Sequence, residues 1–339
     1  YFPNAQGNLY RNQFISFGNT VYYMNNLGSS VVGTYQVDGV NYEFKNDGKL
    51  IPTNIGWADI NGNLYYFNTL GIAQKNWFYV DKDKFHADPK NSIVSKGLQI
   101  IDGKTYYFDV RTGVPYPKMC TNVKFSFGKD VYYFGEDGVG IKLNNLPLGS
   151  RQDGKYLTNN GYILEISNGI ARINGIIIVN KTFSLPSNYN PGLTTATQNA
   201  FYTMRNAANN QGIYLSIISG FRSYQTQAYL YSNYVSNYGV ASADTFSARA
   251  GHSEHQLGEA LDLNSLSQSF GSTGTGIWLN NNAWKYGFII RYPQGKQAIT
   301  GYVYEPWHVR YVGKDLAAKL YNCGNWLTME EYFGINSRY

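Results

Sequence analysis

The first half of the chain repeats one short pattern of aromatic and polar positions. In each copy a turn glycine precedes a short strand rich in Tyr and Phe, and a polar turn with a second glycine follows. The spacing is about 20 residues with a degenerate copy near residues 82–96, and the clearest copies begin at Gly18, Gly39, Gly62, Gly103 and Gly128. Because side chains alternate between the two faces of a strand, each copy predicts a β-hairpin closed by a Gly-containing turn.

A single hairpin cannot bury its aromatic face, so neighbouring copies are expected to stack into a solenoid. We therefore predict an all-β hairpin-repeat solenoid over residues 1–150. Residues 151–172, which hold a worn last copy, are predicted to be a linker. Aromatic faces exposed between copies are suited to sugar rings or quaternary amines, although the same residues can simply form the core of the solenoid.

The pattern changes after about residue 170, where helical spacing and short apolar runs replace the repeats. Helices are predicted over residues 196–208 and 223–238, and strands over residues 214–218 (buried), 260–263, 286–291 and 302–312. Helices and strands alternate irregularly, which favours an α+β domain over a wound parallel sheet. We assign this domain to residues 173–339.

Composition and charge exclude several classes of protein. Aromatic residues make up 17% and charged residues 15% of the chain, which excludes disorder. No apolar run approaches the roughly 20 residues of a membrane span. The net charge of +6 is spread evenly over both halves, so no basic stripe for nucleic acid is present. This mild excess of positive charge is suited to binding an anionic polymer such as a bacterial cell wall.

Two further features concern the cysteines and the first residue. Cys120 and Cys323 define no disulfide framework and are predicted to be free or buried thiols, with one inter-domain disulfide as the alternative. The chain begins with Tyr1 rather than Met, as expected for a protein from which a leader has been removed.

The candidate chemistry lies in the second half, which holds three of the four histidines. His255, Asp262 and His308 supply imidazole and carboxylate donors of the kind that bind a catalytic zinc. Glu305, three residues before His308, is placed to act as general base. By spacing alone these residues could equally be hydrogen-bonded core side chains. His86 is predicted to be a solvated surface residue, and His252 to lie outside the ligand set.

Three phrases in fixed order carry a resemblance to a known family. They are Ser-Gly-Phe-Arg-Ser-Tyr-Gln-Thr-Gln at residues 219–227, Ser-x-His-x-x-Gly-x-Ala-x-Asp at residues 253–262, and Glu-Pro-Trp-His-x-Arg-Tyr at residues 305–311. Together they resemble the VanY/DacB type of bacterial D,D- and L,D-carboxypeptidases, zinc peptidases of the cell wall. The resemblance covers roughly residues 175–325.

This resemblance implies a fold and a set of roles. The fold is the α+β zinc peptidase domain of hedgehog and D-Ala-D-Ala peptidases, an antiparallel sheet with helices. The implied zinc ligands are His255, Asp262 and His308, with Glu305 as the base. Arg222 is implied to polarise the scissile carbonyl or clamp a carboxylate, since a guanidinium presents a planar fork of donors. Ser253 and Gln227 are implied to hydrogen-bond the substrate.

The repeats carry a second resemblance. The phrase at residues 56–71 is similar to the cell-wall- and glucan-binding repeats of Gram-positive surface proteins. Choline-binding members cage their ligand with two Trp and a Tyr at each site, but this half of the chain holds only Trp57 and Trp77, which does not favour choline.

Together these features predict a secreted, cell-wall-associated enzyme of a Gram-positive bacterium. Its repeats are expected to hold a cell-wall polymer, and its zinc domain to remove the C-terminal D-alanine from peptidoglycan stem peptides by D,D- or L,D-cleavage. Two alternatives stay open: an endopeptidase (lysin) of the same fold, and a non-catalytic wall-binding protein.

Overall fold

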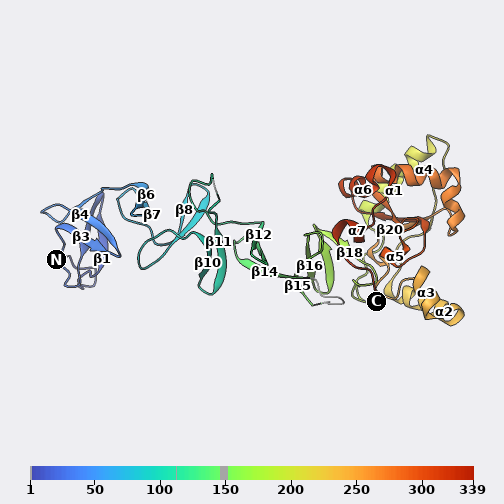
Figure 1. The fold of residues 1–339 in the computed structure, drawn as a ribbon, viewed down its shortest axis with the longest axis horizontal. Coiled ribbons are helices and arrows are strands. Elements are labelled where there is room, and N and C mark those ends of the chain that lie inside the picture. The colour runs from blue at the N-terminus through green and yellow to red at the C-terminus, as the bar shows by residue number, and fades with distance from the viewer. Residues whose placement is uncertain (1, 112, 146–151) are drawn as a thin grey trace. The chain divides into compact units, whose positions relative to one another are not determined.

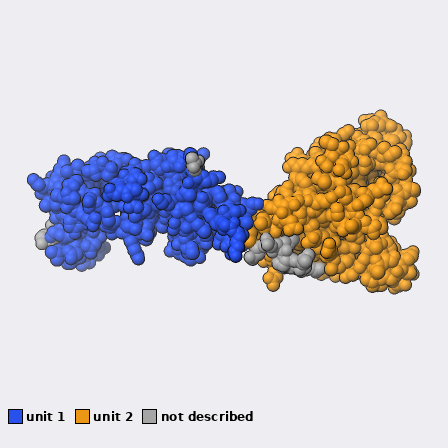
Figure 2. Space-filling view, in the orientation of Figure 1, with its two compact units in different colours: residues 1–142 blue, residues 143–339 orange. Residues whose placement is uncertain are grey.

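The structure is a computed structural model that describes residues 2–111, 113–145 and 152–339. The chain forms two compact units, Tyr1–Lys142 and Leu143–Tyr339 (Figure 2). Within the described ranges, no helix has the length and apolar character that crossing a membrane requires. Cys120 and Cys323 are both free, in agreement with the prediction.

The first unit consists of consecutive antiparallel hairpins (Figure 1). Its strands are β1 (Gln13–Phe17), β2 (Thr20–Met24), β3 (Gly33–Val37), β4 (Val40–Phe44), β5 (Leu50–Ile51), β6 (Gly56–Ile60), β7 (Asn63–Phe67), β8 (Asn76–Val80), β9 (Asp83–Ala87), β10 (Gly97–Ile101), β11 (Lys104–Phe108), β12 (Val123–Phe127), β13 (Asp130–Phe134) and the start of β14 (Gly140–Asn145). The predicted all-β hairpin repeat is confirmed.

The turns explain why the repeats fold as hairpins. In the turn between β3 and β4, Asp38 and Gly39 have φ of 51° and 82°, and in the turn between β6 and β7, Asn61 and Gly62 have φ of 55° and 79°. Positive φ at both central residues defines a type I′ turn, whose twist matches that of the flanking strands. Asp-Gly and Asn-Gly are the sequences that adopt this geometry at least cost.

Neighbouring hairpins share a hydrophobic core. The buried side chains of the first three hairpins form one cluster that includes Tyr42, Phe44, Tyr65 and Phe67. The Tyr42 hydroxyl also accepts a hydrogen bond of 3.1 Å from the backbone N–H of Ala73, which belongs to the next repeat. These aromatics therefore stabilise the repeat itself, as the stacking argument predicts.

The expectation of a solvated His86 is wrong. Its side chain is buried, its Nδ1 lies 2.8 Å from Ser95 Oγ, and its ring lies 5.0 Å from that of Trp77. On paired strands Trp77 faces His86 as Trp57 faces Tyr66. His86 thus occupies the aromatic position of its repeat, and burial lowers its pKa.

The second unit begins with a meander of the strands β15 (Gly154–Leu157), β16 (Ile163–Ser167), β17 (Ile170–Ile173) and β18 (Ile176–Ile178). Residues 151–172, predicted as a linker, are described from Gln152 onward and contribute β15, β16 and most of β17. Their apolar side chains, such as Leu164 and Ile166, lie in the same buried cluster as Phe201 and Leu261. This segment therefore packs with the α+β core.

An antiparallel sheet in the order β19–β20–β22–β21 forms the centre of the second unit. Its strands are β19 (Ile217–Ser219), β20 (Ala260–Leu263), β21 (Phe288–Tyr292) and β22 (Glu305–Tyr311). The helices and helical turns are α1 (Thr195–Asn209), α2 (Tyr224–Tyr238), α3 (Val240–Phe246), η1 (Glu254–Leu257), η2 (Gln268–Ser272), α4 (Gly274–Asn282), η3 (Ala283–Tyr286), α5 (Gln297–Thr300), α6 (Lys314–Tyr321), η4 (Asn322–Gly324) and α7 (Met329–Phe333). The predicted α+β domain with an antiparallel sheet is confirmed.

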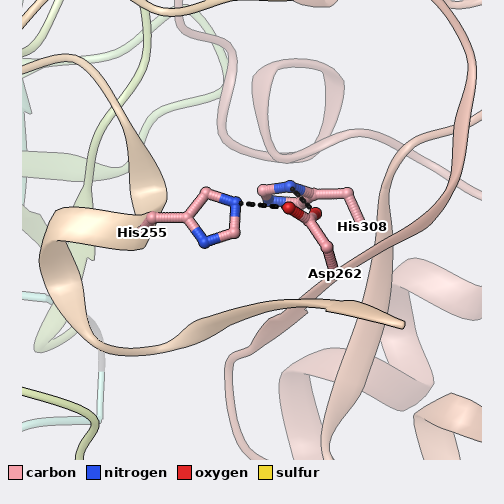
Figure 3. A group of neighbouring side chains, drawn as sticks. All are labelled: His255, Asp262 and His308. Carbon is pink, nitrogen blue, oxygen red and sulfur yellow. Dashed lines mark ion pairs between the residues drawn. The ribbon is translucent and has the colours of Figure 1, made fainter. Parts of the chain in front are cut away.

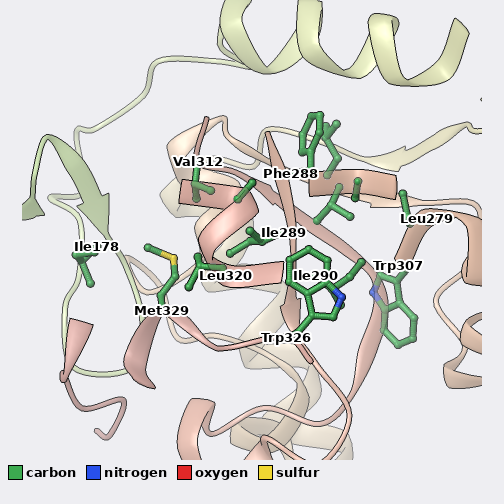
Figure 4. Close-up of a cluster of buried hydrophobic side chains, with 14 of the residues drawn as sticks. Ile178, Leu279, Phe288, Ile289, Ile290, Trp307, Val312, Leu320, Trp326 and Met329 are labelled. Atoms are coloured by element: carbon green, nitrogen blue, oxygen red, sulfur yellow. The ribbon is translucent and has the colours of Figure 1, made fainter. Parts of the chain in front are cut away.

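Two parts of this sheet differ in burial. Strand β21 is buried along its whole length, and Phe288, Ile289 and Ile290 pack in the main core (Figure 4). The sequence predicts a buried strand over residues 214–218. The observed strand is β19, and its predicted burial is wrong. It lies at the edge of the sheet, where Ile217 is 40% and Ile218 50% exposed, because only β20 pairs with it.

Candidate active site

The site is built on the pairing of β20 with β22. Asp262 on β20 lies directly opposite His308 on β22 in the antiparallel register. Opposite residues on paired strands project from the same face of the sheet. Accordingly Asp262 Oδ1 lies 3.1 Å from His308 Nδ1.

The third member of the site comes from the turn η1, which precedes β20. Ser253 caps this turn, because its Oγ accepts a hydrogen bond of 3.3 Å from the backbone N–H of His255. The turn ends at Gly258 with φ of 69°, and a Cβ there would lie 1.8 Å from the carbonyl oxygen of Gly192. Glycine is therefore required, and the reversal places His255 Nε2 3.1 Å from Asp262 Oδ2 (Figure 3).

Hydrogen bonds orient both imidazoles. His255 Nδ1 lies 2.7 Å from the carbonyl oxygen of Gly220, which can only accept, so the ring proton belongs on Nδ1. His308 Nε2 lies 3.4 Å from Glu254 Oε2. With protons on these outer nitrogens, the inner nitrogens His255 Nε2 and His308 Nδ1 face Asp262, and a bound cation would take the place of any proton that His308 Nδ1 carries in the metal-free chain.

His255, Asp262 and His308 fit a metal ion. One donor atom from each lies within 4.8 Å of the other two, and all three side chains are buried. Asp262 Oδ1 is buried and accepts no hydrogen bond in the described part of the chain unless His308 Nδ1, 3.1 Å away, carries a proton, so a cation would complete its environment. Two imidazoles and one carboxylate are a donor set that zinc accepts, with room for a fourth ligand.

Burial and neighbouring charges shift the pKa values of the side chains in this cluster. Burial raises the pKa of Glu305 to about 8, and the nearby carboxylates of Asp262 and Glu254 add to the effect. Burial lowers the pKa of His308, but its contacts with Asp262 and Glu254 outweigh this and raise it to about 9. Burial lowers the pKa of His255, which keeps that ring neutral and ready to bind a cation.

Glu305 begins β22 and approaches the cluster from the same strand as His308. Its Oε2 lies 3.8 Å from His308 Nδ1, and it is 8% exposed. It lies outside the three-residue donor group and faces the same cavity. This is the placement that a general base beside a metal requires.

Arg222 follows β19 and points its guanidinium into the site. Nη1 donates to Gln227 Oε1 over 2.8 Å, Nη2 donates to Ser219 Oγ over 2.9 Å, and Nη2 lies 4.0 Å from Asp262 Oδ2. Gln227 Nε2 donates to the carbonyl oxygen of Ala248 over 2.6 Å. The amide of Gln227 is thus committed to holding Arg222, whereas it was expected to contact substrate.

A cavity of about 420 Å³ opens onto these residues. Every residue predicted for the site lines it: Arg222, Gln227, Ser253, His255, Asp262, Glu305 and His308. Tyr234 on α2, Phe246 on α3 and Trp307 on β22 form part of its apolar wall. The cavity is large enough for a short peptide end and offers both cationic and anionic groups to it.

Sequence reasoning missed Glu254 and Tyr292, which also line the cavity. Glu254 stands beside His255 in the motif, but a glutamate in a polar phrase is usually a surface residue. The sequence does contain a signal for a buried carboxylate. Arg291 and Arg310 each lie within a strand that is otherwise largely apolar, and a buried guanidinium requires an anionic partner.

Comparison with known proteins identifies the family of the second unit. The family model "VanY: D-alanyl-D-alanine carboxypeptidase" matches residues 190–314. YodJ of Bacillus subtilis (strain 168) is 42% identical over 185 residues, which cover 47% of this chain and 67% of YodJ. The chain therefore belongs to the VanY family, and its second unit is a carboxypeptidase domain of that type. The resemblance inferred from the three phrases is confirmed.

Several solved structures are similar to parts of this chain. The LdcB LD-carboxypeptidase is 37% identical, with a TM-score of 0.46, and the match covers 52% of this chain and 96% of that chain. A mutant of the vancomycin resistance D,D-pentapeptidase VanY in complex with Zn(II) is 35% identical, with a TM-score of 0.40, and the match covers 46% of this chain and 97% of that chain. Choline binding protein F from Streptococcus pneumoniae is 24% identical, with a TM-score of 0.28, over 50% of this chain and 52% of that chain.

Proposed function

We propose that this protein is a zinc-dependent carboxypeptidase that removes the C-terminal D-alanine from peptidoglycan stem peptides. One observation carries the proposal: His255, Asp262 and His308 turn their donor atoms toward one point in a cavity that also holds Glu305 and Arg222. The VanY relative in complex with Zn(II), matched over 46% of this chain and 97% of that chain, supports zinc as the metal. The LdcB relative, whose structure is described in terms of peptidoglycan recognition, supports the substrate.

In the proposed mechanism His255, Asp262 and His308 hold the metal. Bound zinc supplies a Lewis acid that makes water acidic near neutral pH. Glu305 accepts a proton from the attacking water at its carboxylate and later returns it to the leaving amine. Arg222, held by Gln227 and Ser219, donates to the carbonyl oxygen or to the terminal carboxylate of the substrate.

Defined peptides test this function. We expect the full chain with zinc to release D-alanine from a pentapeptide stem, a tetrapeptide stem or both, as measured by mass spectrometry of the products. Cleavage inside the stem or cross-bridge without release of D-alanine would instead indicate the endopeptidase alternative. A chain that binds zinc and cleaves none of these substrates would favour the non-catalytic alternative.

We further propose that the first unit binds a cell-wall polymer. Several aromatic side chains of the hairpins are exposed, in contrast to the aromatic residues of the hairpin core. Phe17 is 52%, Tyr35 36% and Tyr79 65% exposed. Exposed aromatic rings are suited to stacking against sugar rings. The net charge of the whole chain, +6 and spread evenly over both halves, adds attraction to anionic wall polymers.

Separating the two units tests this second proposal. The fragment Leu143–Tyr339 keeps β15–β18, which pack in its core. We expect this fragment to hydrolyse small soluble peptides at the rate of the full chain but to sediment poorly with purified cell walls. Equal sedimentation of the fragment and the full chain would contradict a wall-binding role for the hairpins.

A further inference from the structure

Glu254, the residue before the candidate ligand His255, is a fully buried acid. It is 1% exposed, and a buried carboxylate is costly unless it is paired and hydrogen-bonded. Its Oε1 accepts from Arg291 Nε over 2.8 Å and from Arg310 Nη1 over 3.3 Å. Guanidiniums stay charged and can only donate, so the carboxylate that accepts from both is an anion.

The second oxygen of this carboxylate faces His308. Glu254 Oε2 and His308 Nε2 lie 3.4 Å apart. Both atoms are buried, and neither makes a hydrogen bond to any other group in the described residues. Each is therefore the available partner of the other.

The position of Glu254 is set by groups outside the candidate metal site. Arg291 donates from Nη1 and Nη2 to the two oxygens of Glu330 on α7, over 2.9 and 2.7 Å. Arg310 Nη2 donates to Glu259 Oε2 over 2.6 Å. Arg291, Arg310 and Glu330 are each at most 2% exposed, so the carboxylate of Glu254 is held by a packed network.

We propose that Glu254 is a positioning residue that selects the tautomer of His308. A neutral imidazole with its proton on Nε2 donates toward Oε2 and turns the lone pair of Nδ1 toward Asp262. The other tautomer would place a nitrogen lone pair against the carboxylate, which is repulsive. This inference rests on the proposed zinc site, because it explains how Nδ1 is made available to a metal.

The test compares two buried carboxylates that share Arg291. In E254Q, the amide cannot face both Arg291 and His308 favourably: one orientation points NH₂ at the guanidiniums, and the other points it at His308 Nε2–H. We expect the full chain with E254Q to bind zinc about 10- to 100-fold more weakly in competition with a chelator. E330Q disturbs Arg291 but does not touch His308. It should lower the melting temperature and leave the zinc affinity unchanged.

Equal zinc affinity of E254Q and the unaltered chain would overturn the inference, and so would equal weakening by E254Q and E330Q. If E254Q does not fold, ¹⁵N spectra of the unaltered, zinc-loaded protein decide instead: His308 should carry its proton on Nε2, and a proton on Nδ1 would refute the proposal. If the unaltered chain does not bind zinc, the proposed function itself is wrong. This outcome can be told apart from failure of the Glu254 inference, because it is measured without any substitution.

Discussion

Replacing Glu305 with glutamine is expected to lower kcat by about 10²- to 10⁴-fold while zinc stays bound. The amide keeps the size of the side chain and can still form hydrogen bonds, but it cannot accept a proton from water. Steady-state kinetics on a defined stem peptide, with metal analysis of the same sample, measures both effects. Near-normal turnover of E305Q would eliminate Glu305 as the base.

The pH profile gives this prediction a second readout. Glu305 must be deprotonated to act, and burial raises its pKa to about 8 in the metal-free chain. A bound dication favours the carboxylate and moves that pKa down, so kcat/KM should fall with decreasing pH along a limb centred below 8. The limb should be missing from the residual activity of E305Q.

Replacing His255 with alanine is expected to abolish near-stoichiometric zinc binding and, with it, activity. The substitution removes one of the three donors, the ring nitrogen Nε2 that lies 3.1 Å from Asp262 Oδ2. Metal analysis after dialysis measures the loss. If His255→Ala keeps its zinc, the proposed ligand set is wrong.

His252 offers a matched control for this experiment. It stands three residues earlier, is also buried, and places its Nδ1 2.8 Å from the carbonyl oxygen of Asn180 rather than in the ligand cluster. We expect His252→Ala to lower thermal stability and to retain zinc. Zinc loss from both variants would indicate general damage to the fold.

Local sequence signals predicted several elements closely. The strand predicted over residues 260–263 is β20, an apolar run that follows Gly258 and precedes Asn264, both with positive φ. The helix predicted over residues 223–238 is α2, which Ser223 caps and Gly239 ends. Such boundaries depend on residues within a turn of the element, so the sequence alone contains them.

Other features depend on partners that are distant in the sequence. An apolar run such as residues 214–218 predicts a strand, but its place at the edge of a sheet depends on which strands pair with it. The hairpin pattern continues through the Asn168–Gly169 turn, so it could not indicate that β15–β17 pack with the peptidase core. The burial of Glu254 likewise requires Arg291 and Arg310, more than 30 residues away.

The origin of the three candidate ligands has a kinetic consequence. Asp262 and His308 belong to paired strands inside the sheet, whereas His255 belongs to the short turn η1. All four residues of η1 are buried, and Glu254 ties this turn to Arg291 on β21 and Arg310 on β22. Opening the turn would break these buried ion pairs, which places it among the segments that open at high free energy. We therefore expect a metal held by these three residues to exchange slowly with the medium.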